Sequence, residues 1–343
     1  MALRDVIGQA GVVEALKSAV LNRKAASAYL FHGPSGAGKF FTALNFVKAL
    51  NCRRPADFPG VEEKGPAGGK DAADACDHCP ACARIEAGSH PDVVIIRPEK
   101  GVIKIEEIRK LEESLSFRPY EGGYKAAIVD EAHLMNVRAS NAFLKCLEEP
   151  PPESVIVLVS SSPERLPETV RSRCLALRFK PLSASQMESL LEDRVKDPEK
   201  RRALIGLSMG RPGLAIESGE DALRKRREFI KSLMGMLEGS RNPSWSDKEE
   251  IEEFMDGLEL FLRDALVLNS TGREDLLLGA APAPGVPGWP EKLKSLGRSA
   301  KKEVIIDCYH GVAGIRKSLV YNPNKSILWN YTAGLLSRLE NGG

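Results

Sequence analysis

The clearest structural signal in this chain is the stretch AYLFHGPSGAGKF, residues 28–40. Its first five residues are largely apolar, a glycine-rich turn follows, and apolar residues then recur at helical spacing from Phe41 to Leu50. A strand, a glycine-rich loop and a helix in this order form the setting in which backbone N–H groups and a helix N-terminus surround phosphates. The sequence therefore predicts a P-loop domain of the α/β class around these residues.

The loop motif itself is GPSGAGK, residues 33–39. Gly33, Gly36 and Gly38 allow the backbone to turn its N–H groups inward. Lys39 is placed to reach the terminal phosphates of a nucleotide. A glycine-rich turn that carries a lysine by chance is the structural alternative. Because motif and context agree, we interpret the segment as a binding site for ATP or ADP.

The position after the motif departs from the P-loop pattern. A Ser or Thr hydroxyl normally stands there and binds Mg²⁺, but this chain has Phe40. A phenyl ring cannot ligate a metal, and Thr42 lies about 200° further round the helix. The sequence thus predicts nucleotide binding but argues against Mg²⁺ and against efficient magnesium-dependent hydrolysis.

A second motif, AAIVDEAH, spans residues 126–133 and reads as an apolar strand that ends in two carboxylates. In P-loop ATPases one carboxylate at this place holds the Mg²⁺ shell, and a second one orients the attacking water. Asp130 is the candidate for the first role, and Glu131 is a candidate catalytic residue if hydrolysis is retained. The alternative is that both acids only cap the following helix.

Short apolar runs alternate with helical patterns through the first half of the chain. The further runs lie at residues 93–96, 126–129, 155–159 and 175–179, and helical patterns lie at 105–116 and 140–147. Continuous apolar strands that alternate with helices predict a parallel, doubly wound sheet covered on both faces. After Phe179 only helical patterns follow, which predicts a mostly helical C-terminal half.

The overall charge is nearly balanced, with 49 basic and 47 acidic residues among 343 and a formal net charge of +2. The chain therefore lacks the bulk attraction for phosphate of an autonomous nucleic-acid-binding protein. The densest basic run is RKRR, residues 224–227, although such a run is usually a solvated helix face. No segment approaches the roughly 20 apolar residues of a membrane helix, so we expect a cytoplasmic protein without membrane contacts.

Four of the seven cysteines lie before residue 83, in the pattern CDHCPAC at residues 76–82 with one more upstream. Four thiolates are the ligand set of a closed structural zinc site, which has no open position for a catalytic water. We predict that Zn²⁺ is bound by Cys52, Cys76, Cys79 and Cys82. The alternatives are His78 in place of one thiolate, or free reduced cysteines.

Several further stretches resemble the subunits of bacterial DNA polymerase III clamp loaders, which are members of the AAA+ superfamily. VIGQ, residues 6–9, resembles the segment beside the adenine, so the resemblance implies that Val6 and Ile7 contact the base. Ser161, in SSS at residues 160–162, follows a predicted strand where the family has a hydroxyl near the γ-phosphate. The resemblance extends over nearly the whole chain.

SRC, residues 172–174, resembles the arginine-finger motif of clamp-loader subunits. An arginine finger stabilises charge on a transferring phosphoryl group, and in a ring it is supplied to the neighbouring subunit's site. The resemblance therefore implies that Arg173 is catalytic in trans. Taken alone, Arg173 could equally pair with a local carboxylate.

GRPGLA, residues 210–215, stands where ATP-hydrolysing members of the family have a second-sensor arginine, and the matching place here is Gly213. Together with Phe40, this departure resembles delta-prime chains more than gamma or tau motor subunits. It implies no or weak ATPase activity of the chain by itself. DNA-directed DNA polymerase activity would belong to the whole holoenzyme.

The resemblance also implies domains and partners. It places an AAA+ nucleotide-binding domain with a zinc-binding insertion (52–82) at residues 1–180, a helical lid at 181–220 and a helical collar for oligomerisation at 221–343. The implied partners are gamma/tau and delta subunits in a hetero-oligomer, the sliding clamp, and primed DNA through the complex. Helical periodicity alone does not separate such a collar from an ordinary buried helix bundle.

Three functions remain open on the sequence alone. The leading hypothesis is a non-motor, delta-prime-like subunit that supports ATP-driven clamp loading during DNA replication and donates Arg173. The second is a gamma/tau-type ATPase that uses Lys39, Asp130 and Glu131. The third is a homo-oligomeric AAA+ remodeller, which would need a complete site in every subunit and is disfavoured by Phe40.

Overall fold

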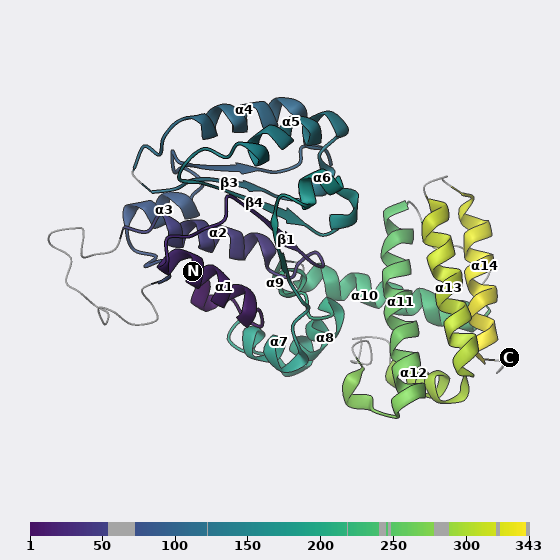
Figure 1. Ribbon diagram of the computed structural model, residues 1–343. Helices are drawn as coiled ribbons and strands as arrows, with labels where there is room; N and C mark the ends of the chain where they lie inside the picture. The colour runs from purple at the N-terminus through teal and green to yellow at the C-terminus, as the bar shows by residue number, and fades with distance from the viewer. Residues whose placement is uncertain are drawn as a thin grey trace. The chain divides into compact units, whose positions relative to one another are not determined.

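The computed structural model describes residues 1–53, 73–121, 123–217, 219–239, 245, 248–277, 288–319 and 323–340. The chain divides into two compact units, and Figure 1 shows the order of their elements. The first unit comprises Met1–Gln186 with Arg211–Gly213, and the second comprises Met187–Gly210 with Leu214–Gly343. The finer division into three domains, at 1–180, 181–220 and 221–343, stays a prediction.

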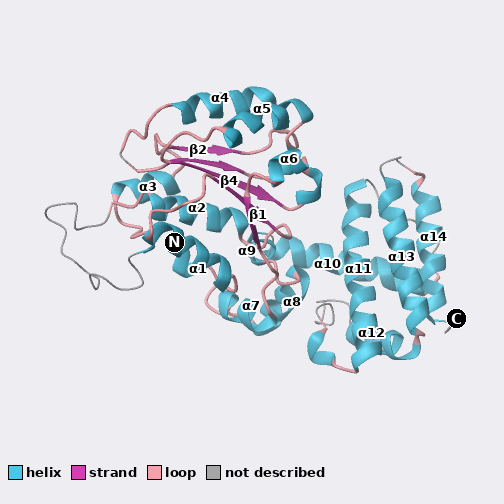
Figure 2. Cartoon of the chain, viewed as in Figure 1, coloured by secondary structure: helices cyan, strands magenta, loops and turns pink. Residues whose placement is uncertain are grey.

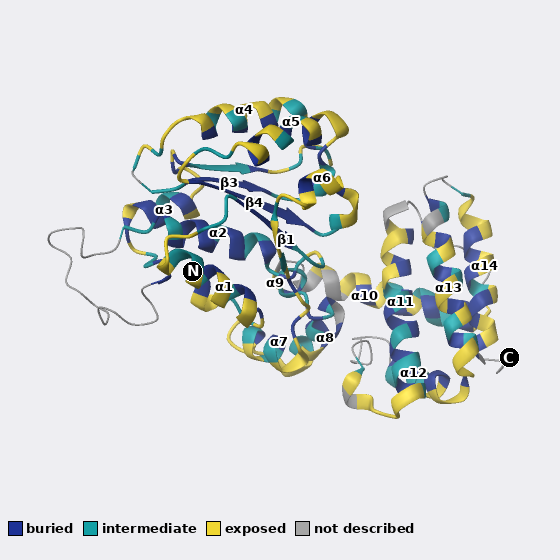
Figure 3. Ribbon diagram, in the orientation of Figure 1, coloured by how far each residue is buried: buried dark blue, intermediate teal, exposed yellow. Residues whose placement is uncertain are grey.

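A five-stranded parallel sheet forms the centre of the first unit (Figure 2), and its strand order is β2-β3-β4-β1-β5. The strands are β1 (Ala28–His32), β2 (Val93–Ile96), β3 (Lys125–Val129), β4 (Ser154–Ser160) and β5 (Leu175–Arg178). β3 and β4 are buried along their whole length, as expected of strands that are covered on both faces (Figure 3). The predicted α/β fold with a parallel, doubly wound sheet is confirmed.

Side chains alternate between the two faces of the sheet, and each face has its own core. Leu30 and Leu158 belong to one core, whereas Phe31 and Val157 belong to the other. The first core is covered by α4 (Ile105–Ser116), α5 (Val137–Glu148) and α6 (Glu168–Arg171), and the second by α1 (Ala10–Leu21), α2 (Lys39–Leu50) and α3 (Pro80–Glu86). The apolar layers on both sides keep the sheet rigid, and the loops at its edge are built on it.

The helix α5 begins at Val137, three residues before the start of the helical pattern at 140–147. Asn136 precedes it, and its side-chain oxygen accepts a hydrogen bond from the backbone N–H of Ala139 at 2.8 Å. This N-cap satisfies a backbone donor of the first turn, which otherwise has no partner within the helix. The start of α5 is therefore set by a polar cap and not by apolar spacing.

The carboxyl ends of β1, β3 and β4 meet at one edge of the sheet, because these strands are parallel. The P-loop follows β1, the acidic pair follows β3, and the three serines follow β4. The 3-10 segments η4 (Ala132–Leu134) and η5 (Pro163–Arg165) follow β3 and β4, and η1 (Leu3–Asp5) precedes α1. Open α/β sheets bind ligands outside this edge, so it carries the candidate nucleotide site.

The second unit is helical, which confirms the predicted helical C-terminal half. Its described elements are α8 (Pro198–Ser208), α10 (Gly219–Leu237), α11 (Lys248–Thr271), η6 (Glu274–Leu276), α12 (Trp289–Ser299), α13 (Lys302–Ser318) and α14 (Lys325–Glu340). Two helices, α7 (Ala184–Leu191) and α9 (Pro212–Glu217), each have residues in both units. Trp289, Trp329 and Phe261 are buried in its core. Throughout the described part of the chain, each helix is too short or too polar to span a bilayer.

Candidate functional site

The loop after β1 requires its glycines for steric reasons. Gly33, Gly36 and Gly38 have φ angles of 144°, 75° and 87°, which residues with side chains rarely adopt. A Cβ atom on Gly33 would lie 2.4 Å from the backbone oxygen of Phe179. Gly38 directly precedes α2, so the loop leads into a helix N-terminus, whose N–H groups favour phosphate.

Lys39 is the first residue of α2 and is almost completely buried. Its Nζ donates hydrogen bonds to the backbone oxygens of Gly33 (2.8 Å) and Pro34 (2.7 Å). Burial lowers the pKa of Lys39, while the negative charges of Glu131 and Asp130 oppose that shift. The ammonium group is therefore held inside the loop, near both acids, and a phosphate would compete with the two carbonyl oxygens for it.

The two acidic residues follow β3 at the same edge of the sheet. Burial raises the pKa of Asp130 and the Glu131 charge raises it further, whereas the charges of Arg97 and Lys39 lower it. Glu131 has a φ of 45°, and its backbone N–H donates to Asp130 Oδ1 at 3.0 Å. Within the described residues 131–134, the Glu131 side chain makes no capping hydrogen bond to η4. The helix-capping alternative therefore finds no support for Glu131.

The Glu131 carboxylate is held instead by polar residues that follow β3 and β4. Ser161 Oγ donates a hydrogen bond to Glu131 Oε2 at 2.8 Å, and His133 Nδ1 lies 3.3 Å from the same oxygen. His133 Nδ1 also lies 3.3 Å from Ser160 Oγ, and burial lowers the pKa of His133. The structure thus brings the predicted residues Glu131 and Ser161 together. His133 had no predicted role, and its position two residues after Glu131 is the signal that could have identified it.

Arg97, which follows β2, is a second residue without a predicted role. Its guanidinium carbon lies 4.7 Å from the centroid of the Phe40 ring. Ile96 and Val129 pair in register, so Arg97 and Asp130 are the first residues after two adjacent strands. No sequence motif marks Arg97, because its neighbours follow only from the pairing of β2 with β3. The side chain at the usual magnesium-binding position of the loop therefore contacts a cation.

The segment Arg211–Gly213 lies against the P-loop within the first unit. The backbone N–H of Gly213 donates to the backbone oxygen of Gly36 at 2.8 Å. A Cβ atom on Gly213 would lie 3.0 Å from Gly36 Cα. Gly213 thus allows two backbones to approach closely, and it offers no side chain to a phosphate.

Val6 and Ile7 are half-buried in the segment that joins η1 to α1. Gln9 ties this segment to the chain after β5, because its amide donates to the backbone oxygen of Lys180 at 2.6 Å and accepts from its N–H at 3.1 Å. The segment is therefore fixed beside the end of β5, a strand that pairs with β1. Contact of Val6 and Ile7 with a base stays a prediction.

Arg173 lies in the turn between α6 and β5, where it makes local contacts. Its Nη1 donates to the backbone oxygen of Thr169 at 2.9 Å, and its Nη2 donates to Glu148 Oε1 at 2.8 Å. The local ion pair considered as an alternative is thus present in the single chain. The side chains of Arg173 and Glu148 are 38% and 52% exposed, and exposed pairs contribute only about 0–1 kcal/mol. The pair is therefore weak enough to exchange for a phosphate, and a role in trans stays a prediction.

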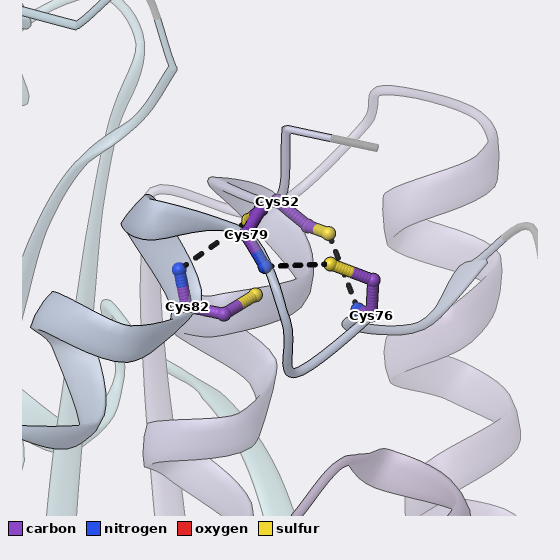
Figure 4. Close-up of side chains that lie close together, drawn as sticks. All are labelled: Cys52, Cys76, Cys79 and Cys82. Atoms are coloured by element: carbon purple, nitrogen blue, oxygen red, sulfur yellow. Dashed lines mark hydrogen bonds between the residues drawn. The ribbon is translucent and has the colours of Figure 1, made fainter. Parts of the chain in front are cut away.

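The four predicted cysteine ligands come together (Figure 4). Their Sγ atoms lie within 4.8 Å of one another, so the group could hold a metal ion. Backbone N–H groups point at three of the sulfurs, from Cys76 to Cys52 (3.2 Å), Cys79 to Cys76 (3.4 Å) and Cys82 to Cys79 (3.5 Å). A hydrogen bond from Cys52 lowers the pKa of Cys82, and the pKa of Cys52 rises in return.

The alternatives for the cysteine group have different outcomes. His78 is exposed and does not belong to the group of possible ligands found among the described residues. The described cysteines form no disulfide, so free reduced thiols remain compatible with the geometry. Residues 54–72 of the long insertion lie outside the described residues. The prediction that they lengthen the separation of Cys52 from the other three ligands concerns this segment.

Charged residues attach the cysteine module to the rest of the first unit. Lys48 on α2 is buried, and its Nζ contacts Asp77, Glu86 Oε2 (2.8 Å) and the backbone oxygen of Met1 (2.7 Å). Asp74 accepts hydrogen bonds from the backbone N–H groups of residues 3 and 4, both at 2.8 Å. Buried charges are tolerated when they are paired in this way, so the module has a defined place against α2.

The basic run at residues 224–227 lies on α10 and is largely paired. Arg224 bonds Asp221 (2.6 Å), and Lys225 contacts Glu253. Arg226 is buried, which lowers its pKa to about 10. Because internal carboxylates neutralise part of the run, it is a poorer phosphate-binding patch than its sequence indicates.

The comparisons with known proteins agree with these features. The family model described as DNA polymerase III, delta subunit, matches residues 8–183. DNA polymerase III subunit delta' of Bacillus subtilis is 30% identical over 281 residues, which cover 79% of this chain and 80% of that protein. Subunit delta' of Pseudomonas aeruginosa is 35% identical over 217 residues, 61% of this chain and 62% of that protein.

The tau subunit of Bacillus subtilis DNA polymerase III is 34% identical over 197 residues, 57% of this chain. The chain spans only about a third of tau, since the match covers 32% of it. The family model thus covers about half of the chain, and the similarity to the delta' subunit extends over most of both proteins. The chain therefore belongs to the DNA polymerase III delta-subunit family, as an AAA+ protein of delta-prime type.

Proposed function

We propose that the chain is a delta-prime-like subunit of the DNA polymerase III clamp loader. In this role it assembles with gamma/tau and delta subunits, supports ATP-driven loading of the sliding clamp on primed DNA in the cytoplasm, and donates Arg173 to a neighbouring ATP site. One observation carries the proposal: the chain's own pocket lacks two groups that serve hydrolysis, at Phe40 and Gly213, while Arg173 remains on the surface in an exchangeable ion pair.

We further propose that hydrolysis by the chain itself is absent or weak. Without a hydroxyl at residue 40 the loop supplies no protein ligand for Mg²⁺, and Gly213 offers no side chain at the position of the second-sensor arginine. Transition-state charge in phosphoryl transfer is normally neutralised by such groups. Glu131 remains available to orient water. The alternative function is therefore a gamma/tau-type ATPase in which Glu131 orients the attacking water.

The proposed metal at the cysteine group is Zn²⁺ in a structural role. Four thiolates would complete a tetrahedral shell and leave no position for water, and N–H···S bonds stabilise the thiolate charge. Because the group joins residue 52, at the end of α2, to α3, the metal would hold the insertion 52–82 together. It would take no part in phosphate chemistry.

The test combines assembly with single-residue variants. The chain is mixed with gamma/tau and delta subunits, and size-exclusion chromatography with light scattering measures the complex. We expect a hetero-oligomer whose DNA-stimulated ATPase falls by up to about 10³-fold in Arg173→Ala, because the transition-state charge loses its partner. Assembly should be intact.

The matched control is Arg171→Ala, an exposed arginine on α6 two residues before the proposed finger. Its complex should hydrolyse ATP at the wild-type rate. Brisk ATPase of the purified chain alone that Lys39→Ala abolishes would favour the gamma/tau-type enzyme. Self-assembled rings without partners would favour the homo-oligomeric remodeller.

A further inference from the structure

Two residues of a P-loop site ordinarily hold Mg²⁺: the Ser or Thr that ends the loop motif, and the first acid after the neighbouring strand. In this chain they are Phe40 and Asp130. Mg²⁺ binds oxygen ligands in near-octahedral geometry, and Phe40 offers none. Mg²⁺ therefore lacks the first of its two usual protein ligands in this loop.

Arg97 lies beside both of these positions. Its guanidinium carbon is 4.7 Å from the centroid of the Phe40 ring, a cation–π contact. On the other side, β2 and β3 pair in register up to Ile96 and Val129, and the N–H of Asp130 donates to the oxygen of Ile96 at 2.9 Å. The positive charge of Arg97 is close enough to oppose the burial that raises the pKa of Asp130. A fixed cation thus stands next to the acid that would otherwise neutralise a metal.

The chemistry of the guanidinium suits a phosphate ligand. The group stays charged at any physiological pH and carries donors in a planar fork that matches phosphate oxygens. Stacking on a ring uses its face, so the N–H bonds at its edge remain directed sideways. Arg97 is exposed, and within the described part of the chain its guanidinium packs on the Phe40 ring. Its edge is therefore accessible to a ligand.

We propose that Arg97, positioned by Phe40 and Asp130, replaces Mg²⁺ in the nucleotide pocket, so that the chain binds the polyphosphate of ATP or ADP without a divalent cation. Lys39 and the loop N–H groups contact the phosphates from one side, and Arg97 contacts them from the side where the metal would stand. Phe40 is then a platform for the guanidinium. The inference rests on the proposed function and deepens it, because the chain would then hold nucleotide as a structural ligand without hydrolysing it.

The experiment measures binding and not turnover. ATP and ADP are titrated into the full chain by calorimetry, with excess MgCl₂ or with excess EDTA. We expect dissociation constants that agree within about threefold in the two buffers, less than the tenfold change that 1.4 kcal/mol produces. Binding that disappears in EDTA overturns the proposal, and so does the absence of binding in both buffers.

Variants identify the residue responsible. Arg97→Ala should weaken binding in EDTA on the order of 10-fold, the effect of losing a hydrogen-bonded charge. Arg97→Lys should lie in between, since it retains the charge and loses the fork. Arg109→Ala, an exposed arginine on α4, is the matched control and should bind as the wild type does. If Arg97→Ala binds nucleotide as tightly as the wild type, the guanidinium does not contact the phosphates and the proposal is overturned.

A double variant tests the replacement in the reverse direction. Phe40→Thr combined with Arg97→Ala restores the metal-binding hydroxyl and removes the cation. This variant should bind ATP on the order of 10-fold more tightly with MgCl₂ than with EDTA, whereas the wild type shows no such difference. Equal affinity in the two buffers would contradict the exchange of Arg97 for a metal. Circular dichroism confirms that each variant is folded.

Failure of this inference is distinguishable from failure of the proposed function. A chain that assembles with gamma/tau and delta subunits but needs magnesium to bind ATP overturns the inference alone. A chain that binds ATP in EDTA but joins no partner overturns the proposed function alone. Assembly and nucleotide binding are measured independently.

Discussion

Gly33 and Lys39 show how much of the nucleotide pocket depends on individual residues. Gly33 has a φ of 144° and faces a backbone oxygen, and Lys39 is buried against the carbonyls of the same loop. Both constraints follow from the shape of the loop, because N–H groups that converge on an anion leave little space for side chains. The motif therefore serves packing and phosphate binding together.

At the residue scale we predict that Gly33→Ala destabilises the chain by about 1–3 kcal/mol. The new Cβ atom would lie 2.4 Å from the oxygen of Phe179, and the φ of 144° is strained for alanine. Urea denaturation measures the change in free energy of unfolding. Gly11→Ala is the control, because α1 leaves open space around that position, and its effect should be about 0.5 kcal/mol or less. Equal stability of the two variants would contradict the steric account.

At the scale of elements, the cysteine module is attached to α2 by charged residues as well as by its thiols. The buried Lys48 contacts Asp77 and Glu86, and Asp74 accepts two backbone N–H groups near the N-terminus. A short helix such as α3 has little stability of its own, so these contacts and a bound metal would act together. Losing the metal should loosen the module and leave the sheet folded.

We predict that the purified chain binds one Zn²⁺ and that Cys79→Ser loses it, because a structural site needs all four thiolates. Atomic emission measures the metal, and hydrogen exchange measures protection of α3, which should fall while that of β3 and β4 persists. Cys174→Ser, outside the group, should retain the metal. A wild-type chain without stoichiometric metal, or metal retained by Cys79→Ser, would refute the assignment.

At the scale of the whole molecule, the chain combines a parallel α/β unit with a helical unit. The first has a core on each face of its sheet, and the second has a single core that includes Trp289 and Trp329. Each unit therefore buries its own apolar surface, which is the main favourable contribution to folding. Several buried titratable groups make the stability of the first unit depend on pH.

We predict that stability falls as the pH drops below the ordinary histidine pKa of 6.5, because burial lowers the pKa of His32, His90 and His133. A lowered pKa means that the unfolded chain binds these protons more readily than the folded chain. The stability they contribute is complete above pH 6.5 and is lost through the window below it. Asp130, whose pKa is raised, acts in the opposite sense.

Urea denaturation at about pH 7.5 and about pH 5.5 brackets this window. The Nε2 of His90 is buried without a hydrogen-bond partner within the described structure, so protonating it in the folded state is costly. His90→Asn removes this titrating group and should reduce the difference between the free energies of unfolding at the two pH values. Metal content is measured at both pH values, so that acid release of a metal is not mistaken for histidine protonation. Stability that rises toward acid pH would show that Asp130 dominates.

The elements and the loop motifs were predictable from the sequence, because their signals are local. Apolar runs marked the strands, glycine spacing marked the loop at residues 33–39, and the CxxCxxC pattern selected three of the four clustered thiols. The capped first turn of α5 was missed, because a single Asn136 has no periodicity. Local sequence patterns therefore indicate the secondary structure and the loops that neighbouring residues form.

Contacts between distant segments came only from the fold. Arg97 lies near Asp130 because β2 pairs with β3, and its contact with Phe40 joins the end of β2 to the start of α2. His133 Nδ1 lies 3.3 Å from Ser160 Oγ because β3 pairs with β4. Strand pairing is a choice among many registers and orders, and no stretch of residues encodes it alone. The motifs therefore indicated where a nucleotide binds, and the packing of the sheet specified which side chains surround it.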